Sequence, residues 1–132
     1  MISGKGILVS GGYRHEAGST DSGIYLDLVE LFDPNTQTSC EITGKLDQAR
    51  SAHPGDGNLV CGGWNGRRLS SCYNVATGDT INLLNGRERH TSWSTDAGIY
   101  LLGGNPDSNY RTTELVTGNT TQAGFRLQYE TR

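Results

Sequence analysis

Short apolar runs that end in a glycine pair recur three times along this chain of 132 residues. The copies read GILVSGG at 6–12, GNLVCGG at 57–63 and GIYLLGG at 98–104. Brief runs that are rich in β-forming residues and bounded by glycine are typical of buried strands. The pattern therefore predicts one short buried strand in each copy.

Each glycine pair follows the last apolar residue of its run. Glycine adopts positive φ and lets another backbone approach closely, and both properties help where neighbouring strands crowd together. One such pair would mark a simple loop, whereas three in the same context indicate a repeated structural position. We expect this role for six glycines: Gly11, Gly12, Gly62, Gly63, Gly103 and Gly104.

A second element follows each glycine pair and reads VELFDPNT at 29–36, SSCYNVAT at 70–77 and TELVTGNT at 113–120. Polar and apolar residues alternate at its start, as they do in half-buried strands, and a turn follows. Further strands are expected at three places, which gives about four strands per repeat. Those places are residues 40–43, 80–84 and 125–129.

A third element joins the repeats. Arg50 with His53 and Arg87 with His90 precede the second and third glycine pairs, and Arg132 holds the position of another such arginine. Three elements that recur in one order with a period of about 40–50 residues predict a repeat architecture. The chain is then one domain with three repeats, at 1–50, 51–87 and 88–132.

Composition narrows the possible partners. The chain has 11 basic and 14 acidic residues, so it lacks the basic surplus that phosphate contact requires, and nucleic acid is not an expected partner. No apolar run approaches the ~18 residues of a membrane span, and residues 1–12 lack the apolar core of a signal peptide. Either the protein is cytosolic or its natural N-terminus lies upstream of Met1.

The three cysteines form no zinc-ligand pattern. A tight hairpin centred between Gly66 and Arg67 places Cys61 directly opposite Cys72, within disulfide reach. The alternative is a pair of buried free thiols, as in cytosolic cores. Cys40 is left over, and any partner for it is expected outside this chain.

Three further features are candidates for chemistry or recognition. The matched placement of His53 and His90 favours a repeated structural role, such as a hydrogen bond between repeats, over service as bases or metal ligands. Asn119 begins an Asn-Thr-Thr sequon in a predicted turn, which makes it a glycosylation candidate. The long loop at 13–23 is either a recognition loop or a disordered insertion.

Together these elements resemble the kelch-type β-propeller repeat. In that family an apolar strand ends in Gly-Gly, an aromatic residue precedes a turn, and a link containing arginine leads to the next unit. The resemblance covers nearly the whole chain and makes it similar also to the central domain of galactose oxidase. The family's outer tryptophan is replaced here by residues 41–42 and 81–82, so the repeats are divergent. The implied fold is all-β, with about three four-stranded antiparallel blades in an incomplete ring.

A propeller closes with about four to eight blades. We therefore expect a segment of a larger propeller whose remaining blades come in cis, or alternatively a ring assembled from two chains. The resemblance implies a non-enzymatic module that binds a protein partner, with no catalytic residue, metal or cofactor. The cysteine pair and the sequon favour an extracellular protein. The alternatives are an intracellular kelch substrate adaptor and a fragment of a galactose-oxidase-like copper-radical oxidase.

Overall fold

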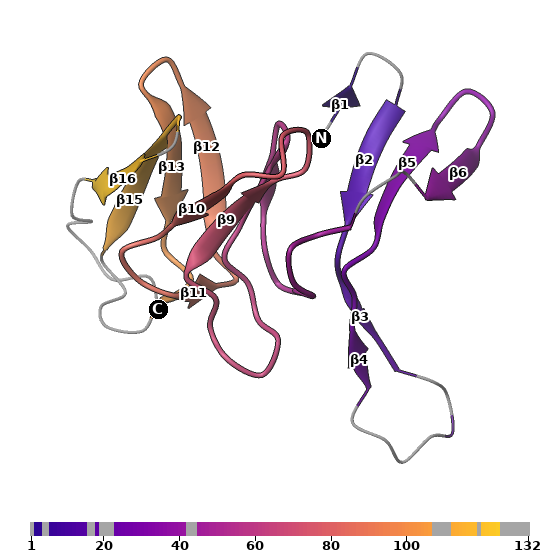
Figure 1. Ribbon diagram of the computed structural model, residues 1–132, viewed down its shortest axis with the longest axis horizontal. Helices are drawn as coiled ribbons and strands as arrows, with labels where there is room; N and C mark the ends of the chain where they lie inside the picture. The colour runs from indigo at the N-terminus through magenta and orange to yellow at the C-terminus, as the bar shows by residue number, and fades with distance from the viewer. Residues whose placement is uncertain are drawn as a thin grey trace.

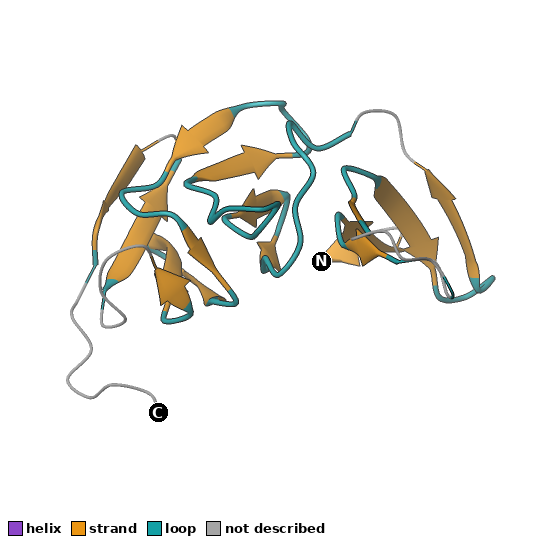
Figure 2. Ribbon diagram, turned by 90° about the horizontal axis from the view of Figure 1, so that it is seen from below, coloured by secondary structure: helices purple, strands orange, loops and turns teal. Residues whose placement is uncertain are grey.

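The strands form three antiparallel sheets of four strands each (Figures 1 and 2). The computed structural model describes residues 2–3, 6–15, 18, 23–41, 45–106, 112–118 and 120–124. Within these ranges every regular element is a β-strand. The expected all-β class is therefore confirmed, and the three sheets lie side by side as an open arc.

In each of the three sheets the spatial order of the strands is also their order in the chain, so each sheet is a four-stranded meander. We call the sheets blades 1, 2 and 3. Blade 1 contains β1 (Ile2–Ser3), β2 (Gly6–Ser10), β5 (Val29–Asp33) and β6 (Thr38–Glu41). Blade 2 contains β7 (Gly55–Asp56), β8 (Leu59–Cys61), β9 (Ser71–Asn74) and β10 (Thr80–Asn82). Blade 3 contains β12 (Thr91–Thr95), β13 (Gly98–Leu102), β15 (Thr113–Thr117) and β16 (Thr120–Ala123).

Two short hairpin-like sheets lie where the central strands of the blades end. One pairs β3 (Tyr13–Arg14) with β4 (Ile24–Tyr25) and extends beyond blade 1 in Figure 1. The other pairs β11 (Arg87–Glu88) with β14 (Asn105–Pro106). They define one edge of the molecule, which we call the loop edge.

The predicted strands agree with the structure in part. The glycine-pair runs form β2, β8 and β13, and the strands expected at 40–43 and 80–84 overlap β6 and β10. The strand expected at 125–129 lies outside the described residues, and the fourth strand of blade 3 is β16.

Strand pairing corrects the alignment of the middle repeat. Cys61 lies opposite Cys72, and the equivalent pairs are Ser10 with Val29 in blade 1 and Leu102 with Thr113 in blade 3. Cys72 therefore corresponds to Val29 and Thr113, whereas the alignment of the repeats in the sequence matches it with Leu31 and Leu115, two residues later. The hydrogen-bonded ladder next to the glycine pairs, rather than side-chain similarity, sets this register.

The blades pack on one another through opposite faces. In each blade the residue two positions before the glycine pair belongs to the leading face, which is directed toward the preceding blade. These residues are Val9, Val60 and Leu101. The residue three positions before the pair belongs to the trailing face, because side chains alternate along a strand. These residues are Leu8, Leu59 and Tyr100.

Two apolar cores hold the arc together. Between blades 1 and 2, Val60 packs with Val29 and Leu46, next to partly buried Leu8 and Tyr73. Between blades 2 and 3 lies a larger buried cluster. Its members are Leu59, Cys61, Cys72, Ile81, Leu83, Leu101 and Val116.

Candidate functional site

The two link arginines are fully buried and hold the blades in place. Arg50 Nη1 donates hydrogen bonds to the carbonyl oxygens of Gly62 (2.9 Å) and Ser71 (3.0 Å), at the ends of the two central strands of blade 2. Arg87 Nη1 makes the equivalent contacts in blade 3. Five fixed donors let one guanidinium satisfy several buried carbonyl groups at once. The recurring arginine is thus a structural element of the repeat.

Each buried guanidinium also has a carboxylate partner. Arg87 Nη2 lies 2.7 Å from Oε2 of buried Glu114, which follows it on blade 3. The position of Glu114 is taken by Tyr73 in blade 2, and Arg50 pairs instead with Asp47, at 2.8 Å. The pairing compensates the cost of burying the positive charge.

The links bind the preceding blade as well as the following one. The amide nitrogen of Gly12 donates to the carbonyl of Arg50, and that of Gly63 donates to the carbonyl of Arg87, both at 2.8 Å. The first glycine of each pair, Gly11 or Gly62, leaves no room for a Cβ beside the same carbonyl. This close approach explains why glycine is needed at Gly11 and Gly62.

The two link histidines pack against the preceding blade. His53 Nε2 donates to the carbonyl of Ser10 across 3.2 Å, which is the hydrogen bond between repeats that the matched placement predicts. Burial, the charge of Arg87 and that of His53 lower the pKa of His90 from 6.5 to about 3, and burial with the Arg50 charge lowers the pKa of His53. Both imidazoles are therefore neutral at physiological pH and serve packing.

A cluster of aromatic side chains lies on the loop edge. The rings of Tyr13 and Tyr25 pack together on the β3–β4 hairpin, with centroids 5.2 Å apart and planes tilted by 53°. Trp64, which follows the second glycine pair, donates from Nε1 to Tyr25 Oη at 3.0 Å. This contact joins the loops of blades 1 and 2.

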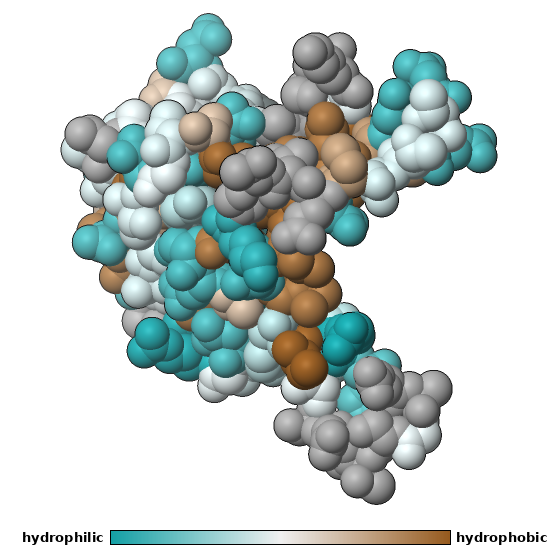
Figure 3. Space-filling model, turned by 45° about the vertical axis from the view of Figure 1, so that its right-hand side comes forward, coloured by the Kyte–Doolittle hydropathy of each residue, from teal (hydrophilic) through white to brown (hydrophobic). Residues whose placement is uncertain are grey.

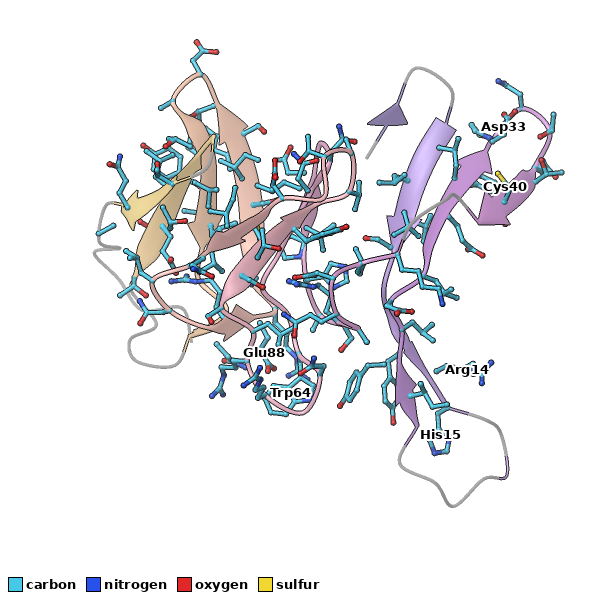
Figure 4. All side chains as sticks on the ribbon, in the orientation of Figure 1. Arg14, His15, Asp33, Cys40, Trp64 and Glu88 are labelled. Carbon is cyan, nitrogen blue, oxygen red and sulfur yellow. A yellow bond between two sulfur atoms is a disulfide. The ribbon has the colours of Figure 1, made fainter. Side chains whose placement is uncertain are left out.

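A hollow of about 300 Å³ adjoins this cluster. Its wall is formed by Ser51, Ala52, Trp64, Arg68, Glu88 and Arg89. Ala52 and Arg89 occupy the same repeat position and have φ of 53° and 55°, so both links adopt a left-handed conformation just before the histidine. In Figure 4, Trp64 and Glu88 lie near this hollow, and Arg14 and His15 extend from the hairpin on the same edge.

The loop edge therefore combines aromatic rings with exposed basic side chains. Arg14, His15, Arg68 and Arg89 are all exposed there, and the Tyr13 side chain is 48% exposed. Asp33 and Cys40 are labelled at the opposite end of blade 1 in Figure 4. The sequence signal for Tyr13, Arg14 and His15 was the long loop, whereas nothing in the sequence pattern marked Trp64.

The cysteine and glycosylation candidates lie elsewhere. Cys61 and Cys72 are joined by a disulfide inside the core between blades 2 and 3. Cys40 is a free, exposed cysteine on β6. Asn119 lies outside the described residues. The disulfide is therefore a cross-link of the scaffold and is not part of the loop edge.

Comparisons with known proteins leave the family open: no protein-family model matches the chain, and no curated protein matches its sequence. Among the described residues, no group of three or more histidine, cysteine or acidic side chains is placed to hold a metal ion. That part of the chain also contains no helix long and apolar enough to cross a membrane.

Proposed function

We propose that this protein is a non-enzymatic recognition module of kelch-like blades that binds a protein partner through its loop edge. The observation that supports the proposal is the cluster of Trp64, Tyr25 and Tyr13 beside exposed arginines. Tryptophan, tyrosine and arginine are the residues most enriched at the energetic centres of protein interfaces.

The scaffold fits this role because it fixes the loops rigidly. Loops that carry function are typically held by a rigid framework of regular structure. Here Arg50 and Arg87 bond to the strand ends from which those loops emerge. A partner then meets a preorganised surface, and less conformational entropy is lost on binding.

The proposed setting is extracellular. The support for it is the disulfide between Cys61 and Cys72, because such cross-links persist mainly in oxidising compartments. Mass spectrometry of the protein from its natural source, after alkylation without reduction, tests this point. One alkylated thiol, at Cys40, is expected. Three alkylated thiols would contradict the extracellular setting and favour the intracellular adaptor.

The binding function is tested with immobilised protein and fluid from the compartment in which the protein occurs. The loop-edge variants are Trp64→Ala and Arg89→Glu. The control variants Thr36→Glu and Thr77→Glu add charge to exposed turns at the opposite strand ends. The expected result is a partner, identified by mass spectrometry, that binds the wild type and both controls but neither loop-edge variant.

Two outcomes would contradict the proposed surface. One is a partner that binds all four variants equally, and the other is a partner lost only with the Thr36 and Thr77 variants. Circular dichroism and the thiol count of each variant verify that loss of binding does not come from loss of the fold.

A further inference from the structure

The hollow of about 300 Å³ on the loop edge is built from both links. The backbone of Ser51 forms two hydrogen bonds with that of Trp64, at 2.8 and 2.9 Å, and the amide nitrogen of Arg89 donates to the carbonyl of Ala52 at 2.8 Å. Glu88 belongs to β11, which is paired with β14. These backbone bonds fix the positions from which the side chains of the wall project.

Glu88 gives this hollow a buried carboxylate. The residue is 7% exposed, and it forms part of the wall. Among the described residues its carboxylate has one polar partner, the side chain of Arg89, whose Nε lies 3.6 Å from Oε1. That separation is too long for a hydrogen bond. A buried carboxylate without a hydrogen-bond donor is costly, so a ligand that donates to Glu88 would remove this cost.

Arg89 places hydrogen-bond donors next to this acceptor. Its side chain is 74% exposed, and Arg68 lies in the same wall. The indole of Trp64 adds a flat apolar surface, and Figure 4 shows Trp64 next to Glu88 on this edge. In Figure 3 the loop edge lies at the bottom of the view, where hydrophobic and hydrophilic surface adjoin. The hollow therefore presents an acceptor, a donor and a stacking surface together.

This combination selects one kind of protein group. A carboxylate only accepts hydrogen bonds and would meet the like charge of Glu88, whereas an ammonium or guanidinium group only donates and would meet the like charges of Arg68 and Arg89. A trans peptide group directs its N–H and its C=O to opposite sides. The primary carboxamide of glutamine or asparagine carries a donor and an acceptor on one edge, and it reads adjacent acceptor and donor atoms on adenine in this way.

We propose that the hollow receives a glutamine or asparagine side chain of the protein partner. The carboxamide nitrogen donates to Glu88, the carboxamide oxygen accepts from Arg89, and the plane of the group stacks on Trp64. A volume of about 300 Å³ is at the lower end of ligand pockets, which suits a single side chain. This inference rests on the proposed function, because it names the group that the partner inserts at the loop edge.

Titration of the isotope-labelled chain with three small probes, followed by NMR, tests the proposal. The probes are the N-acetyl methylamides of glutamine, glutamate and lysine, which share a backbone and differ in the head group of the side chain. The signal is the indole N–H of Trp64, which is identified by its loss in Trp64→Phe. The glutamine probe is expected to bind about tenfold more tightly than the other two, which is the discrimination of one bidentate pair.

Variants of the wall show which atoms produce this preference. Glu88→Met and Arg89→Met each remove one half of the bidentate contact, so each is expected to lose the preference for the glutamine probe. Arg67→Met changes an exposed arginine that does not line the hollow, and it is expected to retain the preference. Arg89→Glu replaces the donor with a second carboxylate and is expected to favour the lysine probe, a gain of binding that an unfolded variant would not show.

The outcomes separate this inference from the proposed function. A wild-type chain that binds the glutamate or lysine probe as tightly as the glutamine probe, or that binds none of them, would overturn the carboxamide site. Retention of the preference in Glu88→Met would also overturn it. Neither result would affect a partner that is captured by the wild type and lost with Trp64→Ala. Conversely, a selective glutamine probe together with a partner that ignores Trp64→Ala and Arg89→Glu would contradict the proposed function alone.

Discussion

At the scale of single residues, the glycine pairs combine two requirements that can be separated. Gly62 has φ of +63° and would place a Cβ 2.6 Å from the carbonyl oxygen of Arg87. Gly103 has a similar φ of +68°, but a Cβ there would have no atom of the described residues within 4 Å. Within the described part of the chain, conformation alone therefore requires glycine at Gly103, whereas conformation and close approach both require it at Gly62.

The replacements Gly62→Ala and Gly103→Ala measure this difference. Gly103→Ala is expected to cost about 1–2 kcal/mol, the strain of a left-handed alanine. Gly62→Ala is expected to cost at least twice as much, because the crowding atom belongs to backbone that also bonds to Gly63. Urea unfolding of both variants gives the two free energies. Equal losses would show that the close contact contributes nothing.

His90 makes the stability depend on pH. Its pKa is about 3 in the folded chain and 6.5 in an unfolded one, so between these values the unfolded chain binds the extra proton. The free energy of unfolding is therefore expected to fall as the pH drops below about 6, by up to ~1.4 kcal/mol per pH unit from this residue.

His90→Phe removes the titrating group and keeps an aromatic ring of similar size. The variant is expected to lose that part of the pH dependence between pH 6 and 4.5, measured by urea unfolding at a series of pH values. His15→Phe, at an exposed position, is the matched control and should retain the wild-type slope. An unchanged slope in His90→Phe would show that His90 protonates equally in both states.

At the scale of strands and turns, local pattern was enough for the central strands. Apolar runs bounded by glycine predicted β2, β8 and β13, because burial and turn chemistry are both encoded locally. The strands β1, β7 and β12 were not predicted from the sequence. They lie at sheet edges, where pairing with one neighbour suffices and no apolar run is required.

The candidate sites also differ in whether a local sequence pattern could predict them. Cys61 and Cys72 could be paired in advance because they face each other across one hairpin. The contact between Trp64 and Tyr25 joins residues 39 positions apart, in different blades, and no local pattern records it. The middle repeat was misaligned by two residues for a related reason, since its register depends on backbone bonds next to Gly62 and not on side-chain similarity.

At the scale of the whole molecule, the blades form a linear array in which each blade contacts only its neighbours along the chain. The stability of such an array is close to a sum of unit and interface contributions. The two interfaces here are unequal. The core between blades 2 and 3 is larger and contains the disulfide, while the core between blades 1 and 2 has three buried members.

Blade 1 is therefore expected to open before blades 2 and 3. Hydrogen exchange of the dilute chain should show faster exchange in β2 and β5 than in β8, β9, β13 and β15, because local opening follows the smallest buried interface. Equal protection of all three blades in the dilute chain would contradict the expected order.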